Sequence, residues 1–136
     1  MRNPLFSLAL LTALAAVPAF AADKLTPGRA VEGVLQASDR SSDSGGRSHD
    51  YTLDLDAGQL VAISAKSEDF DTVLILFGPD GDRVAENDDK EGGGTDSLLV
   101  ASTPVTGTYA VRLNSLPMGE GHTGDYSLRA LVVSDD

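Results

Sequence analysis

The sequence contains no cysteine and no tryptophan, and only two of its 136 residues are histidine. The absence of cysteine excludes a disulfide framework and the acylated cysteine of a bacterial lipoprotein. Basic residues are also few: 10 lysines and arginines stand against 21 aspartates and glutamates, for a net charge of −11. Nucleic acids and anionic membranes attract basic surfaces, so neither is expected as a partner of this acidic chain.

A long apolar run occurs only at the start of the chain. Residues 5–17 are apolar and uncharged, Arg2 precedes them, and residues 19–21 give the small-x-small pattern Ala-Phe-Ala. This order predicts a signal peptide over residues 1–21, cleaved after Ala21. The run is shorter than the roughly 20 apolar residues of a membrane span, so no membrane insertion is expected after cleavage. We expect the chain to be bacterial and either periplasmic or secreted.

The rest of the chain is long enough for one domain with its own core. We divide it into an N-terminal leader (22–28), a domain (29–133) and a C-terminal tail (134–136), and we expect a monomer.

The domain is predicted to be all-β, because apolar and polar residues alternate in short segments separated by turn residues. Tyr51, Tyr109 and Tyr126 fall on the apolar phase of this alternation, so they are predicted to lie in the core. Residues 38–48 are predicted to form a loop. About eight strands of a sandwich or barrel are expected, near residues 29–36, 51–56, 61–66, 71–77, 82–86, 97–102, 108–113 and 126–132.

A series of short motifs follows the order found in one known family, over about residues 29–133. They are Tyr51-Thr52-Leu53-Asp54-Leu55, Ala57-Gly58-Gln59, Asp69-Phe70-Asp71-Thr72, Gly78-Pro79-Asp80-Gly81, Asn87-Asp88-Asp89, Asp96-Ser97, Gly107-Thr108-Tyr109 and Gly124-Asp125-Tyr126-Ser127-Leu128. In this series the chain resembles the bacterial pre-peptidase C-terminal domain.

The resemblance implies a jelly-roll-like antiparallel β-sandwich. Such domains usually follow secreted peptidases, where they assist secretion, are removed or bind substrate, and some bind calcium. No peptidase precedes the domain in this sequence, so we expect a stand-alone accessory or binding module. Its expected ligand is a protein or an extracellular polymer such as a polysaccharide. A structural or adhesive component of the cell envelope is the alternative.

Acidic residues are concentrated in residues 80–96, which hold seven acids and two bases. Calcium takes about six to eight oxygen ligands in flexible geometry and would relieve the repulsion among carboxylates. The spacing is not that of an EF-hand, because Val84 and Ala85 stand where an oxygen ligand and a glycine are needed. A solvated turn-rich loop without an ion is the alternative. The predicted Ca²⁺ ligands are Asp71, Asp80, Asp88, Asp89 and Asp96.

Catalytic residues are scarce. Nucleophilic hydrolysis needs a nucleophile held by a base, and only His49 and His122 could serve as an imidazole base. Both histidines are predicted to lie in loops. We therefore predict no enzyme activity and no catalytic residues, and we retain a small hydrolase only as a competing hypothesis.

Overall fold

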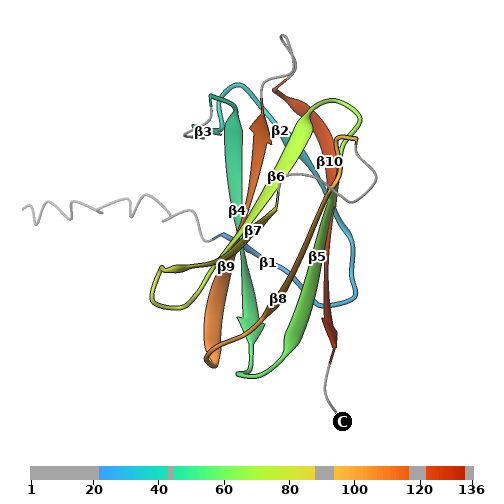
Figure 1. Cartoon of the computed structure of the whole chain (residues 1–136). Helices are drawn as coiled ribbons and strands as arrows, with labels where there is room; N and C mark the ends of the chain where they lie inside the picture. Colours follow the sequence, from blue (N-terminus) through green and yellow to red (C-terminus); the bar gives the residue numbers. More distant parts are fainter. Residues whose placement is uncertain (1–21, 43–44, 88–93, 117–121, 134–136) are drawn as a thin grey trace, which may run out of the picture.

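The computed structural model describes residues 22–42, 45–87, 94–116 and 122–133, and these form two packed β-sheets (Figure 1). The predicted signal peptide and the C-terminal tail lie outside the described residues. The strands are β1 (Asp23–Lys24), β2 (Val31–Leu35), β3 (Arg40–Ser41), β4 (Arg47–Leu55), β5 (Leu60–Lys66), β6 (Asp71–Phe77), β7 (Arg83–Asn87), β8 (Ser97–Ser102), β9 (Gly107–Leu116) and β10 (Gly124–Val133).

One sheet has the order β1-β4-β9-β6-β7, and the short strand β3 also pairs with β4. The other sheet has the order β2-β10-β5-β8. The eight longer strands pair in a nested way: β2 with β10, β4 with β9, β5 with β8, and β6 with β7. A long hairpin rolled onto itself gives this pairing, which is that of a jelly roll. The predicted fold class is therefore confirmed.

The core lies between the two sheets, where alternate residues of each strand point inward. Leu53 of β4, Leu113 of β9 and Ile63 of β5 are fully buried there. The three tyrosines are buried as predicted. Strand β6 is buried on both faces, because Val73 and Ile75 on its outer side are almost as inaccessible as Leu74 and Leu76 on its inner side.

The structure corrects the expected start of the domain. Residues 22–28 are not a separate leader, because β1 pairs in parallel with β4 and Leu25 is buried in the core. The loop predicted at residues 38–48 is also shorter than expected, since β3 lies within it and β4 begins at Arg47. Two-residue strands such as β1 and β3 show no alternation, so the sequence pattern gives no sign of them.

Candidate functional site

A groove opens at one end of the four-stranded sheet. Its volume is about 630 Å³, and it is lined by residues 32–34, 66–69, 96 and 125–127. The groove therefore joins the end of β5, the start of β10, part of β2 and the residue before β8.

The hydroxyl of Ser67 organises the floor of the groove. It donates a hydrogen bond to the carbonyl oxygen of Asp125 (2.7 Å) and accepts one from the backbone N–H of Asp69 (3.1 Å). The Ser67 backbone N–H donates to Oδ1 of Asp96 (3.3 Å), and the Asp125 N–H donates to Oδ2 of Asp69 (2.8 Å). Gly124 lies against the Asp69 side chain at a φ of 138°, where a Cβ atom would collide with it. These bonds hold the carboxylates of Asp69 and Asp96 in place at the groove.

The groove is strongly acidic. Among the described residues that line it, a single side chain, that of Lys66, is basic. A concave surface lined by charge of one sign focuses the electrostatic potential and raises the local concentration of cations or cationic groups. The five carboxylates that line it belong to Glu32, Glu68, Asp69, Asp96 and Asp125.

Two of the predicted calcium ligands lie at the same end of the sandwich as the groove. The backbone N–H of Thr72 donates to the carbonyl oxygen of Thr95 (3.0 Å), so the neighbouring residues Asp71 and Asp96 belong to adjacent segments. Asp80 lies beyond the other end of β6, where its Oδ1 accepts a hydrogen bond from the Asp82 N–H (3.1 Å). A strand of seven residues spans roughly 20 Å, so the structure does not bring Asp80 together with Asp71.

The described residues do not complete a metal site by themselves. Asp88 and Asp89 lie outside them, and within them no group of three histidine, cysteine, aspartate or glutamate side chains is arranged to hold a metal ion. Asp96 already accepts the Ser67 N–H through Oδ1. A calcium ion near Asp71 and Asp96 would therefore need further oxygen ligands besides these two carboxylates.

One of the two histidines, His49, differs in position from the prediction, whereas His122 lies between β9 and β10 as expected. His49 lies in β4 and not in a loop; its ring centroid is 4.8 Å from that of Tyr51, and its Nε2 is 3.8 Å from Oδ2 of Asp23. At His122 the backbone carbonyl accepts a hydrogen bond from the Ser115 hydroxyl (2.7 Å). In the described part of the chain, no hydrogen bond joins either imidazole to a serine hydroxyl.

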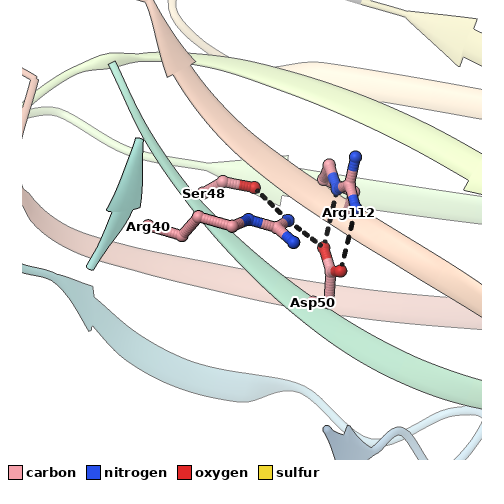
Figure 2. Close-up of polar contacts among 4 residues, drawn as sticks. All are labelled: Arg40, Ser48, Asp50 and Arg112. Atoms are coloured by element: carbon pink, nitrogen blue, oxygen red, sulfur yellow. Dashed lines mark hydrogen bonds and ion pairs between the residues drawn. The ribbon is translucent and has the colours of Figure 1, made fainter. Parts of the chain in front are cut away.

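The outer face of the other sheet carries a charge network that the sequence analysis missed. Asp50 of β4 lies between two guanidinium groups (Figure 2). Arg112 of β9 donates to both carboxylate oxygens of Asp50, from Nε (2.9 Å) and Nη2 (3.1 Å), and Arg40 donates from Nη2 (3.2 Å). Arg40 also donates to the Ser48 hydroxyl (3.0 Å), and the Arg112 guanidinium lies 4.8 Å from the centre of the Phe77 ring.

The carboxylate of Asp50 is paired with both guanidinium groups of this network. Partial burial alone would raise the pKa of Asp50, but the hydrogen bonds and charges of Arg112 and Arg40 outweigh burial and hold the pKa below its usual range. Arg112 lies in a segment predicted as a strand, but Asp50 precedes the strand predicted near residues 51–56 and Arg40 fell in a predicted loop, so the sequence did not indicate that these residues meet. We interpret the network as a structural clamp, which leaves the acidic groove as the candidate site.

The fold and the groove together define an all-β sandwich module with an acidic concave surface. The sequence profile of the bacterial pre-peptidase C-terminal domain matches residues 47–115, so the chain belongs to that family. The chain has no match among curated proteins.

Solved structures share the fold at low sequence identity. The pre-peptidase C-terminal domain of a collagenase from Bacillus anthracis is 15% identical with a TM-score of 0.61, over 79% of this chain and 92% of that domain. PliG of Aeromonas hydrophila, a periplasmic inhibitor of g-type lysozyme, is 16% identical with a TM-score of 0.55, over 82% and 95% of the two chains. PliG of Salmonella Typhimurium is 18% identical with a TM-score of 0.52, over 82% and 97%.

Most of the groove could not be found from the sequence. Asp69 and Asp125 lie in motifs that the sequence analysis singled out, but they are 56 residues apart along the chain. Glu32 lies in a different strand again. Only the jelly-roll pairing of β2, β10 and β5 brings these carboxylates to one end of one sheet.

Proposed function

We propose that this chain is an exported, non-enzymatic module that binds a protein with a positively charged surface. The acidic groove carries the proposal, because five carboxylates and one lysine line it in a chain of net charge −11. Complementary charge steers two proteins together and discriminates against wrong partners. The sequence contains no tryptophan, so no tryptophan side chain can be exposed on the surface. A polysaccharide is therefore a weaker candidate for the ligand.

The partner we propose to test first is a g-type lysozyme. Two structures of the same fold belong to periplasmic inhibitors of g-type lysozyme, which supports a protein as the ligand of this module. Family membership supports a non-enzymatic role, as does the lack, within the described residues, of a hydrogen bond between either imidazole and a serine hydroxyl.

Export is part of the same proposal. It is supported by the predicted signal peptide over residues 1–21 and by the periplasmic location stated for the PliG proteins. None of the described residues forms a helix long and apolar enough to cross a membrane. Fractionation of cells that express the full sequence should place the chain in the periplasm or medium, whereas a variant without residues 2–21 should stay in the cytoplasm.

The binding experiment is calorimetry with a g-type lysozyme of net positive charge, titrated with the chain purified after expression of the full sequence. Salt of about 0.15 M screens exposed charges beyond roughly 8 Å, so non-specific attraction is suppressed. We expect saturable binding in a one-to-one ratio, weakened in the double variant Glu32→Gln and Glu68→Gln.

The matched control is the double variant Asp56→Asn and Asp82→Asn, which removes two exposed charges away from the groove. It should bind like the unmodified chain. Equal weakening in both double variants would mean that net charge alone drives association. Absence of binding would contradict the proposed function, and hydrolysis that depends on His49 or His122 would contradict the non-enzymatic role.

A further inference from the structure

The outer face of the four-stranded sheet is ordered in rows that change from acidic to apolar along the strands. Pairing places Asp125 beside Val34 at the groove end, and Ser127 between Glu32 and Lys66 in the next row. The following row is Arg129, Ser64 and Leu98.

The last two rows are mainly apolar. They consist of Leu131, Ala62 and Val100, and of Val133, Leu60 and Ser102.

Exposed apolar side chains gather on this face. Seven large hydrophobic side chains are exposed in the described part of the chain, and six of them lie in these rows. Val100 is the most exposed, at 54%, and Val105, in the turn before β9, is the one that lies elsewhere. Single exposed hydrophobic residues are ordinary, whereas a contiguous apolar patch rimmed by polar groups marks an interaction surface.

The opposite sheet provides the contrast. On its outer face Val73 and Ile75 are covered, with exposures of 6% and 5%, and the charged residues Asp50 and Arg112 are paired with each other. The large apolar side chains on the outer face of the four-stranded sheet are exposed by 39–54%, with no such cover from the described part of the chain, so this sheet offers the free surface.

We infer that the outer face of the four-stranded sheet is the docking surface for the cationic protein partner, an inference that rests on the proposed function. The rows centred on Leu131, Ala62 and Val100 contact apolar side chains of the partner. The acidic groove at the other end of the same face meets lysines and arginines that border the partner's apolar patch. An apolar centre with a charged rim is the usual anatomy of a protein interface.

Charge complementarity favours a basic protein on this face over a second copy of the chain or an anionic membrane. Two copies of a chain of net charge −11 repel each other, so a second copy is disfavoured on this face. An anionic membrane is repelled for the same reason. A basic protein is attracted by the groove and can then cover the apolar rows.

The test is calorimetry with the same g-type lysozyme and the double variant Val100→Thr and Leu131→Thr. Threonine suits a strand and these sites are exposed, so the variant should fold, which a thermal melt checks. We expect binding roughly ten- to hundredfold weaker, because apolar contact is lost on two side chains. The salt dependence of binding should stay unchanged. The control Val105→Thr alters an equally exposed valine off the face and should bind like the unmodified chain.

The outcomes separate the two proposals. Unchanged affinity in the double variant would overturn the docking surface while the proposed function stands. Absence of binding by the unmodified chain would overturn both. Elution of the chain as a dimer that Val100→Thr and Leu131→Thr convert to a monomer would assign the face to a second copy and overturn the inference.

Discussion

Two tyrosine hydroxyl groups meet inside the sandwich and connect the two sheets. Tyr51 of β4 and Tyr126 of β10 share a hydrogen bond in the buried interior. Gly33 of β2 lies against the end of the Tyr126 side chain, where a Cβ atom would collide with it. Burial raises the pKa of both phenols, so both stay protonated over the physiological range. Their hydrogen bond joins the sheet that contains β4 to the sheet that contains β10.

The Tyr51–Tyr126 pair gives a prediction about coupling. Either Tyr51→Phe or Tyr126→Phe leaves the other hydroxyl buried without its partner, which costs about 1–3 kcal/mol in the free energy of unfolding. The double variant removes both hydroxyls and should cost less than the sum of the single variants. Urea unfolding of the four proteins measures this coupling. Strictly additive losses would contradict it.

Asp50 gives a prediction about pH. Because its pKa is lowered in the folded state, its stabilisation is fully present above the unfolded pKa of about 4 and is lost as the pH falls through the folded value. Asp50→Asn should lower the free energy of unfolding by about 1–3 kcal/mol at pH 7, because charged hydrogen bonds to Arg112 and Arg40 are lost. The difference from the unmodified chain should shrink as the pH falls below 4.

The measurement is urea unfolding of both proteins at pH 7 and at pH 3 or below. Asp56→Asn is the matched control, since Asp56 is exposed, and it should change little at either pH. A loss in Asp50→Asn that is the same at both pH values would show that packing, and not the ionised carboxylate, accounts for it.

At the scale of elements, β1 ties the start of the described chain to the sandwich. The Leu25 N–H donates to the carbonyl oxygen of Thr52 (2.8 Å), and Lys24 Nζ lies 2.6 Å from Oδ2 of Asp54. The Leu25 side chain is 1% exposed and belongs to the core. The short strand β1 and the buried Leu25 that follows it are thus part of the folded domain.

Leu25→Ala should lower the free energy of unfolding by about 2–4 kcal/mol, because it removes buried apolar atoms and leaves a cavity. Thermal and urea unfolding measure the loss. Val105→Ala, at an exposed valine, is the control and should change stability by less than about 0.5 kcal/mol. If both variants were equally stable, the segment before residue 29 would contribute nothing to the core.

The elements that could be predicted are those with a clear period. All eight longer strands overlap the segments expected from the sequence, although β4 begins at Arg47, within a predicted loop. Alternation or an apolar run is clear in β5, β6 and β10, because a buried face imposes that pattern on the residues of a strand. The pattern gave no account of β1, whose pairing depends on Leu25 and Thr52, or of β3. Only the resemblance indicated a jelly-roll-like topology, since alternation shows which face of a strand is buried but not which strand is its neighbour.

At the scale of the whole molecule, negative charge is in large excess, and a divalent cation would reduce its self-repulsion. The calcium prediction therefore stays a proposal about the end of the sandwich that carries Asp71 and Asp96. With a dissociation constant on the order of 10⁻³ M, calcium at about 10 mM would stabilise the fold by about 1.4 kcal/mol.

Such a stabilisation would raise the melting temperature by about 4–8 °C relative to the chain in chelator. Magnesium at the same concentration is the control for general screening by a divalent ion. Asp96→Asn keeps an Oδ1 acceptor for the Ser67 N–H and should abolish most of the calcium effect. Melts that coincide in calcium and in chelator would contradict the proposal.

The position of β10 determines when the molecule can fold. This strand lies between β2 and β5, so these two strands have no common neighbour until residues 124–133 have been synthesised. Before that point β10 is missing from the centre of the four-stranded sheet, so the inward side chains of β2 and β5 cannot form one continuous layer. Pairing between strands that are far apart along the chain is also slow. Folding therefore waits for the last strand. A chain that stops before residue 124 is expected to be degraded instead of persisting as half a sandwich.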